Sequence, residues 1–210
     1  IAWPNDLSGI LPMSLKEPGL LLLLLGAFTP TLAAFIAMGG NRQAWRDFLR
    51  RFNPFLAPLL PALKRYAALL AVMSAFLFLV FYIRQFLGFD GLQRRIDVAS
   101  LALIPALATA AFLDLGGVLE EGGWRGFAQV ELENTNWSPF KAALLIGIIW
   151  GLWHVPRDVI SGVTERYGLI LYITAYLPSF LMNTVASACL CAFFMHRLGG
   201  SIWPAIMVHG

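Results

Sequence analysis

Long apolar runs separated by short polar segments dominate this chain. A helix needs about 20 apolar residues to cross the hydrocarbon core of a bilayer. The runs that approach this length lie at 19–38, 66–85, 98–119, 140–155, 168–195 and from 201 to the end. No alternation of apolar and polar residues lasts long enough to indicate a β-barrel. We therefore predict an all-α fold, a polytopic bundle of transmembrane helices.

The segment between the first two runs has a different pattern, that of an amphipathic helix at 44–52. Its apolar residues recur at i, i+3, i+4 and i+7, as on one face of a helix: Trp45, Phe48, Leu49 and Phe52. Its arginines form a separate stripe: Arg42, Arg46 and Arg50. This combination is typical of a helix that lies in a membrane interface. The alternative is a solvated connector.

The same connecting segment, with Lys64 and Arg65, carries six of the 15 basic residues. Loops rich in lysine and arginine stay in the cytoplasm. By alternation, the loops after the third and fifth runs are also cytoplasmic. This places Glu120 and Glu121 at the cytoplasmic end of the third predicted span.

Composition supports a membrane protein. The chain is 59% hydrophobic and 13% charged, whereas soluble domains are about 25% charged. A soluble domain of this length could not keep so much apolar surface from water. The length allows one domain, 1–210. The net charge is +3, and most basic residues lie near span ends, which suits lipid headgroups better than nucleic acid. We expect no nucleic-acid partner.

The two ends and the two cysteines add little. The chain begins with Ile1 without the pattern of a signal peptide, and it stops at Gly210 directly after an apolar run. We expect it to be a domain truncated at both ends. Cys189 and Cys191 are two residues apart, which on a helix points them in different directions, so we expect packing residues rather than a disulfide.

Two adjacent carboxylates, Glu120 and Glu121, close the third predicted span. Ionisable residues in a membrane are costly and usually mark a functional site. On a helix, Glu121 and Arg125 have the i, i+4 spacing of an ion pair, and Glu120 points about 100° away from Glu121. One carboxylate can thus be held by Arg125 while the other acts as a general base. The glycine pairs at 116–117 and 122–123 permit close helix approach. The alternative is that both glutamates simply face lipid headgroups.

Two of the three histidines lie in apolar surroundings on other predicted helices. His154 closes the fourth run and His209 lies in the last. Histidine in such a setting typically belongs to a relay, a metal site or a catalytic cluster, the alternative being a packing role. His196 lies beside Arg197 at a span end, and we interpret it as interfacial. We predict that Glu120, His154 and His209 converge on one cavity.

These three residues also have the composition of a His₂Glu zinc site with an open position for water. A His-Glu-x-x-His motif is absent, which excludes the soluble zincin arrangement. The serines lack a Gly-x-Ser-x-Gly context, and Lys64 and Lys141 lie at span ends. The residues leave Zn²⁺ bound by Glu120, His154 and His209 and a metal-free glutamate mechanism equally open. No other cofactor site is indicated.

Three motifs follow one another along the chain. The first is Glu120-Glu121-x-x-x-Arg125-Gly-Phe, the second is Trp150-x-x-x-His154-x-Pro156, and the third runs from Gly200-Ser201-Ile-Trp-Pro204 to His209. Their order and spacing resemble those of the CPBP intramembrane proteases. That family includes type II CAAX prenyl endopeptidases and bacteriocin-processing, Abi-like or immunity proteins. The run at 26–34, followed by the arginine-rich helix, resembles the N-terminal region of the family, so the resemblance covers nearly the whole chain.

The resemblance implies an intramembrane endopeptidase that cuts peptides or membrane-associated proteins at the cytoplasmic face. Glu120 would activate water with the assistance of His154, and His209 would stabilise the oxyanion. Glu121 and Arg125 would orient the site. The partners implied are a peptide or membrane-protein substrate and the lipid bilayer, and the expected location is the inner membrane of a bacterium.

The chain departs from the family pattern in two places. Trp150 stands where the family usually has Phe, which keeps an aromatic ring one turn from His154. The last motif usually reads His-x-x-x-Asn or Asp, and its fourth residue would fall at position 213, beyond the sequence. Asn183 in the fifth run is another candidate polar group, with packing as the alternative.

Two other classes compete with the protease. The first is a catalytically inactive scaffold or immunity factor of the same fold. The sequence argues against it, because every motif residue that can be checked is present. The second is a proton-coupled transporter that uses the carboxylates as a relay. A transporter predicts paired broken helices and internal repeats, and the sequence has no convincing repeat.

Overall fold

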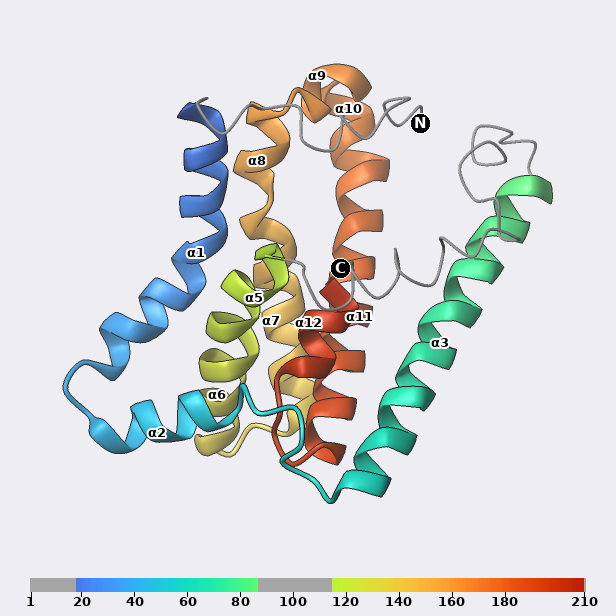
Figure 1. Ribbon diagram of the computed structural model, residues 1–210. Coiled ribbons are helices and arrows are strands. Elements are labelled where there is room, and N and C mark those ends of the chain that lie inside the picture. Colours follow the sequence, from blue (N-terminus) through green and yellow to red (C-terminus); the bar gives the residue numbers. More distant parts are fainter. Residues whose placement is uncertain (1–17, 87–114, 210) are drawn as a thin grey trace.

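A computed structural model describes residues 18–86 and 115–209. Every regular element in these two ranges is a helix, which confirms the predicted all-α class. Figure 1 shows α1, α7 and α11 upright, α2 across the lower end and α3 leaning away from the rest. The elements are α1 (Pro18–Met38), α2 (Arg42–Arg50), α3 (Leu59–Phe86), α5 (Leu115–Glu121), the π-helical η3 (Gly122–Ala128), α6 (Gln129–Asn134), α7 (Pro139–Trp153), α8 (Val155–Ile160), α9 (Val163–Tyr167), α10 (Leu169–Leu171), the π-helical η4 (Tyr172–Tyr176), α11 (Leu177–Arg197) and α12 (Trp203–His209).

Three helical segments in the described part are long and apolar enough to cross a membrane: Leu59–Phe76, Pro139–Ile160 and Leu169–Arg197. They coincide with the second, fourth and fifth predicted runs. The first predicted run, 19–38, forms α1. The third predicted run, 98–119, lies outside the described residues up to position 114.

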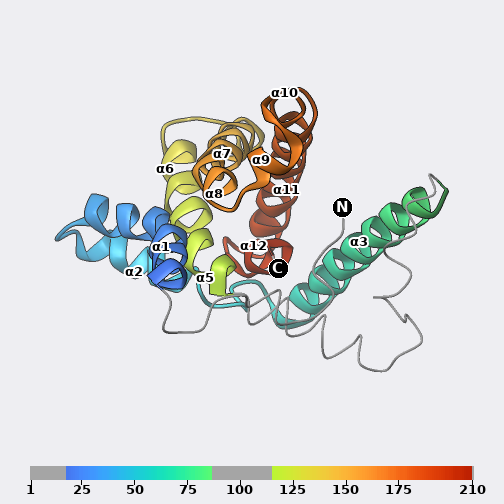
Figure 2. The ribbon, with the colours of Figure 1, turned by 90° about the horizontal axis from the view of Figure 1, so that it is seen from above.

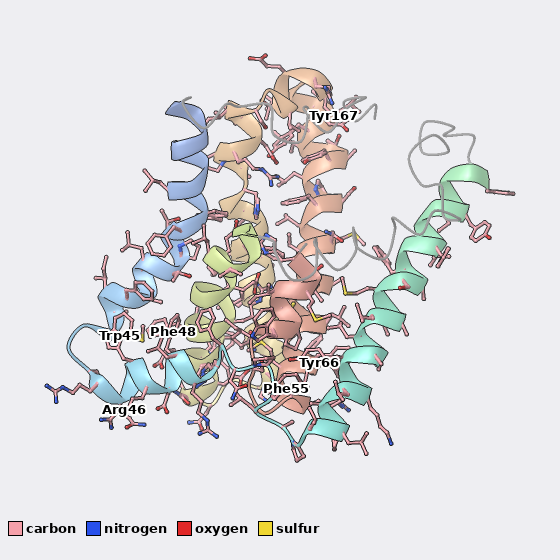
Figure 3. The ribbon with its side chains drawn as sticks, in the orientation of Figure 1. Trp45, Arg46, Phe48, Phe55, Tyr66 and Tyr167 are labelled. Atoms are coloured by element: carbon pink, nitrogen blue, oxygen red, sulfur yellow. The ribbon has the colours of Figure 1, made fainter. Side chains whose placement is uncertain are left out.

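The predicted amphipathic helix is α2, two residues earlier than its apolar pattern indicated. Asn41 starts it, because its side chain accepts hydrogen bonds from the backbone N–H groups of Gln43 and Ala44. Phe48 is buried, and the Trp45 ring lies 4.8 Å from that of Phe35 on α1. Figure 3 shows Trp45 and Phe48 on the side of α2 that faces the bundle and Arg46 projecting away from it. The helix therefore lies flat under α1 with its basic stripe outward.

The centre of the bundle is the close pair α7 and α11. A Cβ atom on Gly147 would lie 2.6 Å from the Cα of Val185, and one on Gly151 would lie 2.6 Å from the Oγ1 of Thr184. Only glycine at these positions lets the two backbones approach so closely. The close contact between α7 and α11 fixes the position of His154 along the bundle, because His154 directly follows α7.

A second close contact joins α1 to η3. Pro30 has no N–H to donate to the Gly26 carbonyl, and the Thr29 hydroxyl donates to that carbonyl instead, at 2.7 Å. The Thr31 hydroxyl donates to the Leu119 carbonyl and accepts from the Gly123 N–H. The part of α1 that Pro30 interrupts therefore binds the segment that carries the two glutamates.

The C-terminal helix α12 is anchored to the loop after α2. The Ile202 N–H donates to the Arg51 carbonyl at 3.0 Å, and the Trp203 indole N–H donates to the Phe52 carbonyl at 2.7 Å. Behind these bonds lies an apolar cluster from α11 and α12: Cys191, Met195, Ile202, Ala205 and Ile206, all buried. This packing places His209 beside the glutamates. In Figure 2, seen from above, α12 lies between α5 and α11.

The two cysteines are unbridged, which agrees with the packing role expected of them.

Candidate active site

The two glutamates end α5, but the chain stays helical beyond them through η3 and α6 as far as Asn134. They therefore lie within a longer helical run, in which Arg125 is one turn beyond Glu121, as the i, i+4 spacing predicted. The glycines at 122 and 123 were expected to permit close helix approach. They pack against α1 in a π-helical segment, a departure from α-helix that is frequent at functional sites.

Glu121 holds the charged part of the site together. Its side chain is 1% exposed, and its Oε1 accepts from Arg125 Nη1 at 3.0 Å. The same oxygen accepts from His209 Nδ1 at 3.1 Å. Arg125 is also 1% exposed, and its guanidinium carbon lies 4.6 Å from the ring centroid of Trp150. The i, i+4 ion pair that the sequence predicted is thus present and fully buried.

Glu120 has different partners. It is buried, and its Oε2 accepts from the indole N–H of Trp150 at 2.9 Å. His209 Nε2 lies 4.0 Å from the same oxygen. The two carboxylates are therefore unequal, because Glu121 is paired with Arg125 and Glu120 is held by a neutral indole.

His154 lies behind Trp150. Its Nδ1 is 2.7 Å from the Trp150 carbonyl oxygen, and because a carbonyl can only accept, Nδ1 carries the hydrogen. In the neutral ring, Nε2 is then the nitrogen with a lone pair. The His154 ring packs edge-on against Trp153 and Phe180, with centroids 5.0 and 5.3 Å away.

The five residues singled out in the sequence thus gather at the junction of α5, α7 and α12. Glu120 and His209 face each other directly, whereas His154 reaches the group through Trp150, whose ring lies 5.8 Å from that of His154 and 5.3 Å from that of His209. Two other candidates lie elsewhere. Asn183 is exposed on α11, and the exposed His196 pairs with Glu133 at 3.0 Å.

The arrangement does not form a three-ligand metal site. Within residues 18–86 and 115–209, no three His, Cys, Asp or Glu side chains are grouped closely enough to hold a metal ion. Glu120 and His209 are adjacent, but His154 is directed at the Trp150 backbone. The predicted Zn²⁺ set of Glu120, His154 and His209 is not brought together by this geometry, and we derive no catalytic step through a metal.

One functional contact was not anticipated. Trp150 was read as an aromatic neighbour of His154, yet it is the hydrogen-bond donor to Glu120 and the ring beneath Arg125. The residue type at position 150 could have indicated this contact, because Trp has an N–H donor that Phe lacks.

Comparison with known proteins identifies the group to which this site belongs. A family model described as type II CAAX prenyl endopeptidase, Rce1-like, matches residues 100–210. The chain belongs to this family. The match covers all three motifs and confirms the resemblance drawn from them. The family and the apolar helices together make the chain an integral membrane protein of a peptidase family.

A curated relative extends the similarity beyond the matched region. It is the CAAX prenyl protease 2 of Methanococcus maripaludis, 28% identical over 197 residues, which cover 90% of this chain and 69% of the relative. No solved structure matches the chain.

Proposed function

We propose that this chain hydrolyses a peptide bond within the membrane, with Glu120 as the general base. The observation that carries this proposal is the unequal partnering of the two buried carboxylates. The Arg125 charge is taken up by Glu121, which leaves Glu120 with a single indole donor and able to accept a proton from water. A positioned general base contributes about 10²–10⁴-fold to a rate.

The reaction needs one water molecule and no further reactant. Glu120 takes a proton from the water molecule. At the same time the water oxygen attacks the carbonyl carbon of the peptide. The C–N bond then breaks, and the proton held by Glu120 passes to the leaving nitrogen, so the products are an amine and a new carboxylic acid, which ionises to a carboxylate. His154 assists through Nε2, the nitrogen that the Trp150 carbonyl leaves without a hydrogen.

His209 is placed to stabilise the oxyanion. Its Nδ1 is already bonded to Glu121, so its Nε2 must donate, which requires the imidazolium form. Donors aimed at developing negative charge typically supply the largest part of such catalysis. Glu121 and Arg125 then act as positioning residues that hold His209 in place.

The substrate class that we propose is a membrane-associated polypeptide or peptide. The relative from Methanococcus maripaludis is named a CAAX prenyl protease, and a C-a-a-X sequence is a C-terminal motif whose cysteine is prenylated. A prenylated CAAX peptide is therefore the first probe, and a general peptide library is the second.

The side of the membrane is part of the proposal. The basic stripe of α2 supports a cytoplasmic position for the lower end of the bundle, and the proposed location is a bacterial inner membrane. About 20 Å along the helix axis separates Glu121 from Asn134 near that end. A substrate approaching from the cytoplasm would thus have to extend into the bundle.

The test compares the purified wild-type protein with Glu120→Gln in liposomes. Gln keeps the size of the side chain and its ability to accept from Trp150 but cannot take a proton. We expect thermal unfolding to be unchanged and cleavage to fall by at least 100-fold. Chelator is added in a parallel series, and we expect cleavage to continue, because the described residues offer no three-ligand metal set. Loss of cleavage on chelation with recovery on adding zinc would overturn the metal-free route.

The second candidate is an inactive scaffold of the same fold. It predicts that neither wild type nor Glu120→Gln cleaves any peptide and that both support the same cellular phenotype.

A further inference from the structure

A second polar cluster lies one helical turn beyond His154 and takes no part in the chemistry proposed above. Asp158 on α8 is fully buried, at 0% exposure. Its Oδ1 accepts from Nε and Nη2 of Arg157, at 3.2 and 2.8 Å, and its Oδ2 accepts from the Tyr172 hydroxyl at 3.1 Å. Both carboxylate oxygens are thus engaged, and one edge of the guanidinium is held fixed.

Within the part of the chain that the structure describes, the other edge of that guanidinium is largely open. Arg157 keeps 43% of its side chain exposed, although its partner Asp158 is buried. A guanidinium has five N–H donors. Asp158 takes two of them, and the Tyr176 hydroxyl lies near enough to interact with the guanidinium. At least two N–H donors of Arg157 therefore remain for a bound ligand.

Arg157 lies beside an apolar groove of about 540 Å³, because its guanidinium packs near Phe180, one of the residues that line the groove. The groove is formed by the end of α9, by α10 and η4, and by the start of α11, and is lined by Tyr167, Leu171, Ala175, Tyr176, Ser179 and Phe180. Tyr167, one of these residues, is labelled at the upper end of the bundle in Figure 3. The guanidinium carbon of Arg157 is 5.5 Å from the ring centroid of Phe180.

An aromatic stack connects this groove to the candidate active site. Tyr172, Tyr176 and Phe180 are four residues apart and so share one helical face. The centroids of Tyr172 and Tyr176 are 5.4 Å apart, and those of Tyr176 and Phe180 are 6.1 Å apart. Phe180 in turn contacts the His154 ring. One wall of the groove, Phe180, is therefore in direct contact with His154.

Arg157 follows His154 by three residues, on α8, and both side chains neighbour the Phe180 ring. An extended segment of three residues spans about 10 Å. The proposal below requires a C-terminal segment of about this length between the bond cleaved at Glu120 and the guanidinium.

We propose that Arg157, oriented by Asp158 and Tyr172, binds the C-terminal carboxylate of the peptide substrate, with the apolar residues before that carboxylate seated along Phe180 and Tyr176. The proposal rests on the proposed hydrolase function and adds the recognition of a free C-terminus. Arginine is the residue best suited to this task, because its planar fork binds a carboxylate through two parallel hydrogen bonds. The apolar lining suits aliphatic side chains and excludes water, which strengthens the pairing.

The test measures binding rather than cleavage, so that it stands apart from the proposed function. Two fluorescent prenylated peptides of the same sequence, one ending in a carboxylate and one in an amide, are titrated against Glu120→Gln protein in nanodiscs. We expect the acid to bind at least 10-fold more tightly. Adding Arg157→Gln should abolish this preference by weakening binding of the acid alone. Arg166→Gln, a change to an exposed arginine on α9, should leave it intact.

Because Arg157→Gln leaves a buried carboxylate without its partner, the double variant Arg157→Gln, Asp158→Asn provides neutral groups of similar shape and is measured in parallel. In protein with Glu120 intact, Arg157→Gln should raise KM for the acid substrate with little change in kcat. Equal affinity of the Glu120→Gln protein for the acid and amide peptides would overturn the inference. An equal loss of affinity for both peptides in the Arg157→Gln variants would also overturn it. Failure of the wild type to cleave any peptide would instead overturn the proposed function, and the acid-to-amide ratio would still decide the role of Arg157.

Discussion

At the scale of single residues, the site depends on how hydrogen-bond donors are divided between two neighbouring carboxylates. Glu121 receives the charged donors and Glu120 receives the indole. This division comes from position rather than composition, because Arg125 is one turn from Glu121 along the same helix whereas Trp150 comes from another. A change to any of these donors should therefore alter one carboxylate more than the other.

Replacing Trp150 tests the contact to Glu120. Trp150→Phe removes the N–H donor but keeps an aromatic ring over Arg125. A hydrogen bond to a charged acceptor contributes about 1.5–3 kcal/mol, so we expect kcat/KM to fall by roughly 10-fold or more while the protein stays folded. Trp153→Phe is the matched control, since the Trp153 ring packs on Trp124 and His154 and should cost far less. Equal losses in the two variants would show that the indole N–H has no special role.

The buried ion pair gives a prediction about stability. Arg125→Ala would leave the Glu121 charge buried beside His209 alone, and breaking a buried pair in this way costs about 3–5 kcal/mol. We expect a large fall in melting temperature and in activity. Arg46→Ala, on the outward face of α2, should change stability by less than about 0.5 kcal/mol. Thermal unfolding in detergent and liposome binding measure both, and similar effects of the two changes would contradict the proposed role of Arg125.

At the scale of elements, the site is positioned by close contacts between helices, which glycine residues make possible. The α1–η3 contact depends on Gly123, where an added Cβ would lie 2.2 Å from the backbone carbon of Pro30. The α7–α11 contact depends on Gly147 and Gly151 in the same way. The first contact sets the position of the glutamates and the second sets that of His154.

The α1–η3 contact can be tested with one methyl group. Gly123→Ala should push α1 from η3, with an overpacking cost of about 1–3 kcal/mol or more and a loss of activity from displaced glutamates. Gly26→Ala adds the same group on α1 where nothing lies within 4 Å, so it should be tolerated. The melting temperatures and cleavage rates of the two variants provide the comparison, and a stable, active Gly123→Ala protein would show that the close contact is dispensable.

At the scale of the whole molecule, the two ends of the bundle differ in character. The basic α2 lies at the lower end, and the short helices α8 to α10 form the upper end (Figure 1). The apolar groove is lined by residues of α9, α10, η4 and α11. The candidate active site lies between the two ends. Orientation in the membrane therefore decides from which side a peptide C-terminus reaches the site.

Orientation is measured with single cysteines in a background that carries Cys189→Ala and Cys191→Ala. We expect Arg46→Cys to react with a membrane-impermeant maleimide only after the cells are opened, because positive loops stay in the cytoplasm. Glu165→Cys, on α9 at the opposite end, should react in intact cells. The reverse pattern would contradict the predicted orientation and place the mouth of the groove on the cytoplasmic side.

Much of the architecture followed from the sequence because membrane helices are specified locally. Runs of apolar residues determine where α1, α3, α7 and α11 lie, and the arginine stripe determined α2 to within two residues. The ion pair of Glu121 and Arg125 was also readable, because i, i+4 spacing within one helix needs no information about other helices.

The remainder was decided by tertiary packing. The predicted apolar run ended at 119, whereas the structure stays helical as far as Asn134 and includes a π-helical segment in which Gly123 packs on Pro30. The hydrogen bond from Trp150 to Glu120 and the turning of His154 toward a backbone carbonyl depend on how three helices meet. Spacing along one chain does not contain those angles and distances. The sequence by itself determined which groups are available for chemistry, and only the tertiary structure decided which of them touch, because contacts between helices arise from the fit of whole surfaces.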